Sequence, residues 1–200
     1  MEYSSAHIER LIEGFAGLPG IGRKTAQRLT FYVLRMSQEE ASSLVEAIRA
    51  VKENVGYCKE CGNISESQPC NICRDENRVK SQICVVEQPG DVIAIEKTGM
   101  YKGQYFVLGG ALSPQEGVGP DDLRIDKLVE KVARNGIEEV VVATNPNAQG
   151  ETTAFYLSEA LSPTGAKITR IARGVPMGSD LEYSDQSTLA RSLEGRKEMS

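Results

Sequence analysis

Four of the chain's five cysteines lie within one short segment and have the spacing of metal ligands. Cys58 and Cys61 form one Cys-x-x-Cys pair, and Cys70 and Cys73 form the second. Each pair can direct two thiolates at one point, and the short link lets all four sulfurs surround one Zn²⁺ tetrahedrally. Because four sulfur ligands leave no open position for a substrate, the pattern predicts one structural zinc ion per chain.

The residues between these cysteines cannot form a stable fold on their own. Ile64 and Ile72 are the only large apolar side chains among them, which is too little surface to order the segment. Two disulfides would suit a secreted protein, but no signal peptide opens the sequence, and we expect a cytoplasmic protein. A redox dithiol would need a single pair beside a βαβ unit. Zinc therefore remains the favoured interpretation.

A glycine-rich turn, Leu-Pro-Gly-Ile-Gly, separates two predicted helices at 5–15 and 23–34. Its glycines allow backbone N–H groups to approach a phosphate closely, and the following helix start adds the positive end of its dipole. Basic side chains flank this point. We predict that nucleic-acid backbone is bound here by Gly20, Gly22, Arg23, Lys24 and Arg28.

The same turn has two other interpretations. A P-loop is disfavoured because the lysine stands one position late and a helix, not a strand, precedes the loop. An ordinary corner between helices remains open. The charge distribution favours DNA: the stretch from Phe15 to Met36 has four basic and no acidic side chains, in a chain of net charge −5. We expect the remaining, acidic surface to repel DNA.

Beyond the cysteines, short apolar runs alternate with amphipathic segments, which is typical of a mostly parallel α/β sheet covered on both faces. The predicted strands are 82–87, 104–108, 139–144 and 167–172. The predicted helices are 91–97, 121–134 (capped by Asp121) and 151–161. The carboxyl ends of such strands form the natural crevice for a site.

Helices are also predicted before and after the sheet region along the chain. Ser37 and Glu40 form a capping-box pattern, and the helix that follows is expected to turn Leu44, Ile48, Val51 and Val55 towards a core. Near the other end, an extended arm precedes a helix at 184–193. The arm carries the apolar residues Val175, Met177, Leu181 and Tyr183. It should fold back on its own domain or reach a neighbouring subunit.

Polar residues stand where two predicted strands end. Glu87 closes the first strand with Asp91 shortly after it, and Asn145 and Asn147 follow the third, with Glu151 beyond. An Mg²⁺-dependent nuclease or strand-passage enzyme could use Glu87, Asp91 and Glu151. Mg²⁺ prefers charged oxygen ligands, however, and the two asparagines supply none. We therefore expect no catalysis, and predict that this face docks a protein partner.

Several of these motifs resemble known domains. Leu-Pro-Gly-Ile-Gly-Arg-Lys-Thr-Ala resembles a helix-hairpin-helix, which grips nucleic-acid backbone without reading sequence. The sheet region resembles the Toprim domain of primases, topoisomerases and certain nucleases. Active Toprim domains hold Mg²⁺ with a glutamate after the first strand and an Asp-x-Asp after the third. Here Thr-Asn-Pro-Asn stands in place of that acidic pair.

The order of motifs, ending in the arm Gly-Val-Pro-Met-Gly-Ser-Asp-Leu-Glu-Tyr, resembles the RecR family of recombination mediators over essentially the whole chain. The resemblance implies a non-enzymatic bacterial protein of DNA repair, associated with the nucleoid when acting. It implies binding to single- and double-stranded DNA, dimeric or tetrameric rings, and work with RecO and often RecF. Together these proteins load recombinase onto single strands coated by single-strand-binding protein.

We therefore expect a multi-part α/β protein with four regions. These are a helix-hairpin-helix region at 1–57, a four-cysteine zinc finger at 58–79, a mostly parallel Toprim domain at 80–172, and an arm with a helix at 173–200. The sequence has no apolar run long enough to cross a bilayer, so no membrane partner is expected.

Overall fold

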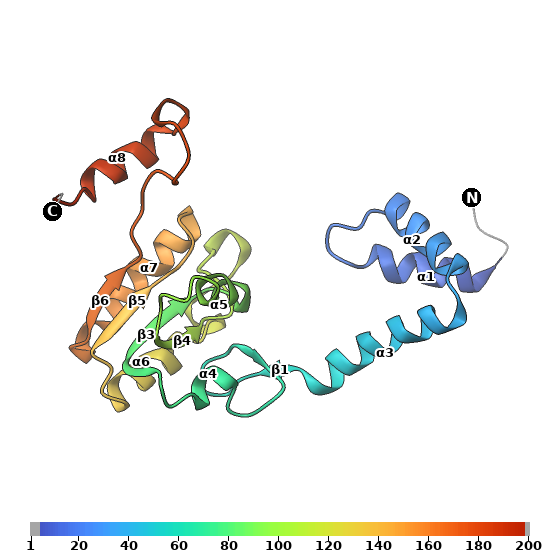
Figure 1. Cartoon of the computed structure of the whole chain (residues 1–200), viewed down its shortest axis with the longest axis horizontal. Coiled ribbons are helices and arrows are strands. Elements are labelled where there is room, and N and C mark those ends of the chain that lie inside the picture. Colours follow the sequence, from blue (N-terminus) through green and yellow to red (C-terminus); the bar gives the residue numbers. More distant parts are fainter. Residues whose placement is uncertain (1–4, 199–200) are drawn as a thin grey trace. The chain divides into compact units, whose positions relative to one another are not determined.

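A computed structural model, which describes residues 5–198, divides the chain into two compact units, Met1–Val55 and Gly56–Ser200 (Figure 1). Each unit has its own packing and is described by itself. The extreme ends of the first and last expected regions, 1–4 and 199–200, lie outside the described residues.

The first unit begins with two helices that pack against each other, α1 (Ala6–Ala16) and α2 (Arg23–Arg35). Ile12 of α1 and Ala26 and Thr30 of α2 are buried. The turn between the helices includes Gly20, whose φ of 76° lies in the left-handed region that favours glycine. The predicted pair of helices around a tight turn is confirmed.

Helix α3 (Gln38–Asn54) begins at the predicted capping box. Ser37 Oγ accepts the Glu40 N–H at 3.2 Å, and Glu40 Oε2 accepts the Ser37 N–H at 2.8 Å. The expectation that this helix faces a core is wrong for the single chain. Its apolar residues Leu44, Val45, Ile48 and Val51 are 42–60% exposed. The reason is that neither α1 nor α2 packs extensively along α3, so none of its residues is buried.

The second unit opens with the cysteine-rich segment, a small finger. It comprises β1 (Gly56–Tyr57), which pairs antiparallel with β2 (Ile64–Ser65), and the single-turn helix α4 (Asn71–Arg74). The buried side chains of the finger are mainly its cysteines, with Ile72 half-buried beside them. This agrees with the prediction that apolar burial alone would not order the segment.

The rest of the second unit is built on a sheet. Its strands are β3 (Val79–Val86), β4 (Gly103–Val107), β5 (Glu139–Val142) and β6 (Lys167–Arg170). They lie in the order β4-β3-β5-β6, and every neighbouring pair is parallel, with Ile83 aligned to Val140. The helices are α5 (Pro89–Glu96), α6 (Ile125–Arg134) and α7 (Ala148–Leu161). The predicted parallel α/β sheet is confirmed.

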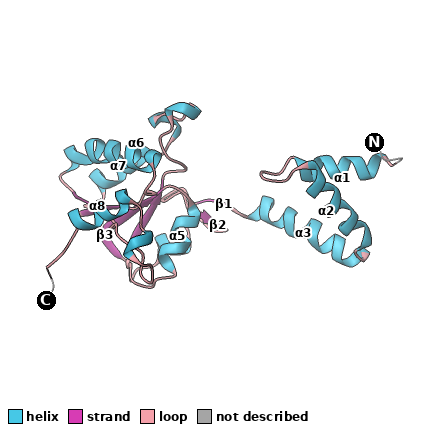
Figure 2. Ribbon diagram, turned by 90° about the horizontal axis from the view of Figure 1, so that it is seen from above, coloured by secondary structure: helices cyan, strands magenta, loops and turns pink. Residues whose placement is uncertain are grey.

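The sheet is covered on both faces, as Figure 2 shows for α6 and α7 on one side and α5 on the other. The larger core joins alternate strand residues such as Val85 and Val142 to Leu128 of α6 and Leu157 of α7. The smaller core joins Cys84, Val86, Tyr105 and Val107 to Val92 of α5, with Ile72 of the finger packed against it. The finger therefore helps α5 to cover one face of the sheet.

The connection into α6 differs from the prediction that Asp121 caps this helix. A 3₁₀ turn, η2 (Pro120–Asp122), precedes α6, and the helix begins only at Ile125 with Arg124 as its N-cap. Proline and glycine favour that tight turn, and Asp122 closes it by accepting the Gly119 N–H at 2.8 Å. Another 3₁₀ turn, η1 (Pro114–Glu116), lies earlier in the same loop.

The end of the chain leaves the sheet as an arm. After η3 (Ser162–Thr164) and β6, the arm contains the turn η4 (Leu181–Tyr183) and helix α8 (Gln186–Glu194). Asp185 caps α8 by accepting the Thr188 N–H at 3.0 Å. Met177, Leu181 and Tyr183 are each at least 66% exposed. Among the described residues, no helix is long and apolar enough to span a membrane.

Candidate metal centre and nucleic-acid interface

The four predicted zinc ligands come together in the finger. The sulfur atoms of Cys58, Cys61, Cys70 and Cys73 all lie within 4.8 Å of one another, and Cys61 and Cys70 are 3.6 Å apart. Three of the cysteines are buried and Cys73 is half-buried. The first knuckle closes where the Gly62 N–H donates to the Cys58 carbonyl at 2.8 Å. The geometry suits one tetrahedral ion.

The protonation of the cluster shows why it needs a cation. A hydrogen bond from Cys73, helped by the backbone at Asn63, lowers the pKa of Cys61 to about 5 despite its burial. Burial, together with the charge of Cys61, raises the pKa of Cys70 to about 11. One thiolate therefore makes the next unfavourable. A bound dication removes this conflict. Its charge stabilises neighbouring thiolates together, so the thiol protons are released when the metal binds.

Backbone contacts fasten the finger to the sheet domain. The Val107 N–H of β4 donates to the Cys61 carbonyl at 2.7 Å. The side chain of Arg124, the N-cap of α6, donates to the Lys59 carbonyl at 3.2 Å. The side chain of Lys131, within α6, donates to the Glu60 carbonyl at 3.2 Å. Pairings between residues this far apart in sequence carried no local signal. The finger is therefore anchored by the domain beside it as well as by its own cysteine cluster.

The predicted DNA-binding residues lie in the turn between α1 and α2 and in the first two turns of α2. Gly22 is the N-cap of α2, and Arg23, Lys24 and Arg28 are exposed on that helix. Among the described residues, the Lys24 and Arg28 side chains form no hydrogen bond or ion pair. Arg23 instead pairs with Glu9 of α1, a neutralising contact that the acid-free local sequence did not reveal. Lys24 and Arg28 are thus the available cations.

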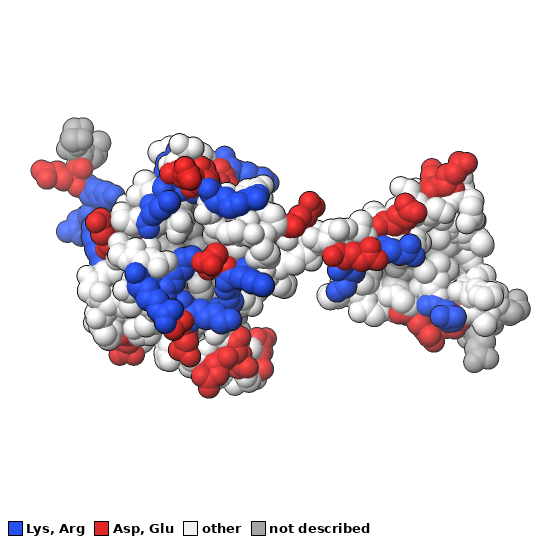
Figure 3. Space-filling model, turned by 90° about the horizontal axis from the view of Figure 1, so that it is seen from below, with Lys and Arg blue, Asp and Glu red and all other residues white. Residues whose placement is uncertain are grey.

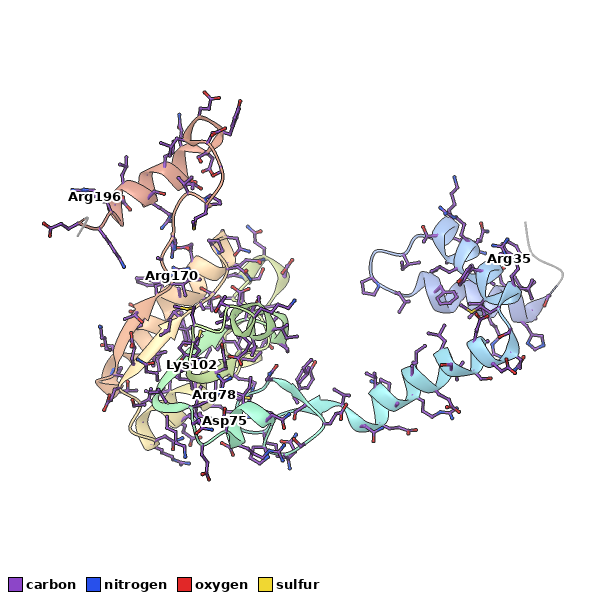
Figure 4. The ribbon with its side chains drawn as sticks, in the orientation of Figure 1. Arg35, Asp75, Arg78, Lys102, Arg170 and Arg196 are labelled. Carbon is purple, nitrogen blue, oxygen red and sulfur yellow. The ribbon has the colours of Figure 1, made fainter. Side chains whose placement is uncertain are left out.

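Sequence reasoning missed one neighbouring feature of α2. A surface hollow of about 460 Å³ on α2 is lined by Arg28, Tyr32 and Arg35. Figure 4 labels Arg35 on this helix. Tyr32 is 57% exposed. The helical spacing of these residues, four and seven positions along the chain, was the signal that could have extended the predicted site.

At the carboxyl end of the sheet, Glu87 is not available as an open ligand. Its carboxylate is 7% exposed and accepts two hydrogen bonds from one residue. The Asn145 backbone N–H reaches Oε1 at 2.8 Å and Asn145 Nδ2 reaches Oε2 at 2.6 Å. Gly150 permits this packing, because a Cβ there would lie 2.0 Å from the Asn145 carbonyl oxygen. The asparagine thus takes the place of a counter-ion.

The next two residues of the expected partner-binding face act as helix caps. Asp91 Oδ2 accepts the Gln88 N–H at 2.8 Å at the start of α5. Asn147 Oδ1 accepts the Gly150 N–H at 2.8 Å at the start of α7. Both side chains satisfy backbone donors that helix starts leave free. Asn145 and Asn147 are nevertheless exposed, so a partner can reach them.

Glu151 is surrounded by arginines that the sequence analysis did not single out. Arg170 and Arg173 donate to its carboxylate at 2.8–3.0 Å, and Arg191 of α8 lies 3.8 Å away. Burial opposes ionisation, but the Arg173 hydrogen bond and the charges of both nearer arginines prevail and lower the pKa of Glu151. Figure 4 shows Arg170 where β6 leads into the arm. The site is therefore a positively charged cluster around one carboxylate.

Comparison with known proteins decides the family. The RecR helix-hairpin-helix model matches residues 8–52, the RecR four-cysteine zinc-finger model 55–75, a Toprim domain model 81–172 and the RecR C-terminal model 174–197. "Recombination protein RecR" of Chloroherpeton thalassium is 50% identical over 205 residues, covering all of both chains. The chain belongs to the RecR family.

Other RecR relatives agree. The protein of the same name from Heliobacterium modesticaldum is 51% identical over the full length of both chains. That of Chloroflexus aggregans is 53% identical over 98% of this chain and 95% of its own. Because the RecR zinc-finger match contains all four clustered cysteines, they hold one structural zinc ion, as predicted. The resemblance drawn from the motifs is likewise confirmed.

Proposed function

We propose that this RecR-family protein is a non-catalytic mediator of recombinational DNA repair that binds single- and double-stranded DNA as an assembled clamp. The observation that carries the proposal is the contrast between its two candidate sites. Within the described part of the chain, Lys24 and Arg28 are exposed and unpaired beside a helix-hairpin-helix turn, whereas Glu87 and Glu151 are engaged by other side chains.

Metal-dependent cleavage is disfavoured by the same contacts. Phosphoryl transfer depends on Mg²⁺ positioned by carboxylates, which the ion requires as hard, charged ligands. Here Glu87 is bonded to Asn145, and Glu151 is neutralised by Arg170 and Arg173. A cation at this point would have to displace an amide and compete with two guanidinium groups. We propose that the face formed by Glu87, Asp91, Asn145, Asn147 and Glu151 instead docks a protein partner, RecO or RecF.

Assembly is part of the proposal because one hairpin binds DNA weakly. Two or three cations neutralise about 2–3 phosphates, which gives low affinity and a shallow dependence on salt. Linking several hairpins raises affinity by roughly 10²–10⁴-fold without new contacts. The exposed apolar residues of α3 and of the arm support self-association, since such residues are covered when subunits meet. We propose dimeric or tetrameric rings.

The proposed division of labour follows the expected regions. Residues 1–57 bind DNA, 58–79 form the zinc finger, 80–172 present the partner-binding face, and 173–200 link subunits. Gly20, Gly22 and Arg23 would shape the DNA contact around Lys24 and Arg28. The cellular site of action proposed is the bacterial cytoplasm, at the nucleoid.

The test is to measure native mass and DNA affinity on the same samples. Lys24→Glu should abolish binding to duplex DNA and leave the assembly intact, whereas the matched exposed variant Lys167→Glu should change neither. A chain ending after Gly174 should lose assembly first and DNA binding in consequence. Normal DNA binding by Lys24→Glu, or tight binding by a monomeric truncation, would overturn the clamp. Mg²⁺-dependent nicking that disappears in Glu87→Gln would favour the enzyme instead.

A further inference from the structure

We propose that the second unit holds its own binding site for single-stranded DNA, in a groove between the zinc finger and α6. The finger–α6 groove is formed by Tyr57, Lys59, Arg124, Lys127, Lys131 and Arg134. The proposal rests on the proposed function in taking DNA as the ligand, but it uses no residue of the helix-hairpin-helix. It also names the DNA form, which the hairpin alone does not determine.

The groove consists of two adjoining hollows within the second unit. One, of about 690 Å³, is lined by Tyr57, Lys59, Arg124 and Lys127. The other, of about 320 Å³, shares the last three of these residues and continues past Lys131 and Arg134. Figure 3 shows Lys and Arg side chains gathered around a hollow on this unit. A continuous path for a strand therefore lies between finger and helix.

The groove carries an excess of positive charge, although the chain is acidic. Its two hollows are lined by five basic residues and three acidic ones, Glu60, Asp122 and Glu130. Lys131 lies 3.8 Å from Glu60, and Arg134 pairs with Glu130 at 3.1 Å. In the part of the chain that the structure describes, the Lys59 and Lys127 side chains have no such partner. The local charge is therefore opposite to that of the acidic, repelling surface expected beyond the hairpin.

The groove is also preorganised by Arg124. Its guanidinium lies 4.8 Å from the centre of the Phe106 ring and donates to the carbonyls of Lys59 and Val107. Only a glycine fits opposite, because Gly62 has a φ of 79° and a Cβ there would lie 2.8 Å from the Val107 carbonyl oxygen, besides meeting the Arg124 guanidinium. A fixed cation loses less side-chain entropy on binding a phosphate than a free one. The closely packed finger and α6 thus hold the charge in place.

Tyr57 is the feature that favours single strands. Its side chain is 71% exposed and lines the larger hollow together with the unpaired Lys59 and Lys127. The Gln68 side chain holds the strand that carries Tyr57, because its Nε2 donates to the Tyr57 carbonyl at 3.0 Å. Surfaces for unpaired nucleic acid combine a cationic groove with aromatic rings on which bases stack. A duplex keeps its bases stacked internally, and an acidic peptide has no base to offer.

The experiment measures binding of the full chain to a labelled oligothymidylate and to a duplex of equal length, over a series of salt concentrations. Tyr57→Ala should weaken oligothymidylate binding about 5- to 140-fold, the loss of one base–aromatic stack, with the salt slope unchanged. Tyr57→Phe, which keeps the ring, should bind normally. Lys59→Glu combined with Lys127→Glu should lower the slope by at least about 1.4, since two phosphate contacts are lost.

Three controls make the outcome decisive. Lys167→Glu should have no effect. Lys127→Glu alone should lower the salt slope by about half as much as the double variant. Because Lys127 lies far in sequence from the cysteines, this variant leaves the zinc-finger sequence unchanged. Lys24→Glu tests the hairpin separately: if it fails to bind while the groove variants bind normally, the proposed function stands and the groove is overturned. Equal losses on duplex and single strand in Tyr57→Ala would overturn it too. The groove would also be overturned if the double-lysine variant no longer bound an oligoglutamate peptide but still bound oligothymidylate.

Discussion

Asn145 should be the residue that stabilises an otherwise unpaired buried carboxylate. Asn145→Asp replaces the Nδ2 donor, 2.6 Å from Glu87 Oε2, with a second carboxylate of nearly the same shape. The backbone N–H bond to Glu87 at 2.8 Å remains. Because Glu87 is 7% exposed, it cannot turn to water to escape the new charge. We expect the variant to fold but to be less stable than the wild type.

Two losses determine the size of this effect. A hydrogen bond to a charged group contributes about 1.5–3 kcal/mol. Two like charges about 4 Å apart add up to about 4 kcal/mol near a protein surface. Asn145 is exposed, however, and an aspartate there can rotate towards water. We expect the free energy of unfolding to fall by about 2–4 kcal/mol at pH 7, a decrease in Tm of roughly 4–16 °C.

The assay is thermal unfolding of wild type, Asn145→Asp and Asn145→Ala in chelator and in millimolar Mg²⁺. Mg²⁺ should restore stability to the aspartate variant, because the ion binds the folded pair of carboxylates and not the unfolded chain. Asn145→Ala loses only the hydrogen bond, so Mg²⁺ should not stabilise it. Lowering the pH, which protonates one carboxylate of the pair, should also recover the aspartate variant.

Equal stability of wild type and Asn145→Asp in chelator at pH 7 would refute the reasoning. So would an Mg²⁺ response of the same size in the alanine variant. The first result would mean that the amide does not stabilise Glu87. The second would place the ion at another site.

Three further predictions concern other contacts. Cys73→Ser should release the zinc ion and expose the smaller core beside Ile72, while the sheet strands keep their hydrogen-exchange protection; retained zinc in metal analysis would contradict this. The Arg78 hydrogen bond lowers the pKa of Glu96, so its stabilisation should be complete above the ordinary carboxyl pKa near 4.3 and disappear as pH falls through the lowered value. Glu96→Gln should abolish that acid-side loss in unfolding curves, while an unchanged pH profile would argue against the pair. Burial raises the pKa of Cys84 to about 12, so iodoacetamide should label it only after unfolding, as mass spectrometry of native and denatured protein can show.

Local patterns were enough to predict much of the protein. The Cys-x-x-Cys pairs identified the zinc ligands because each knuckle is made by residues three apart. The capping box at Ser37 and Glu40 and the apolar period of the strands are equally local. They predicted the start of α3 and the parallel sheet, and the two asparagines after β5 already argued against an acidic metal site.

What tertiary structure alone decided depends on residues far apart in the chain. The helical period predicted an apolar face on α3, but whether that face is covered depends on what packs along it, and neither described helix of the first unit does so extensively. A short stretch of sequence could not show that Glu9 of α1 pairs with Arg23 of α2. Nor could it show that Asp121 lies in a 3₁₀ turn before α6 and is not the N-cap of that helix.

The two candidate binding features of the second unit show the same limit most clearly. Asn145 bonds to Glu87 across 58 residues, and only the parallel register of β3 and β5 brings them together. The finger–α6 groove joins residues near 57 to residues near 124–134, because Val107 and Arg124 fasten the finger beside that helix. Net charge, summed over the chain, is negative. The local field follows instead from which side chains the fold places next to one another, and that is set by packing between distant segments.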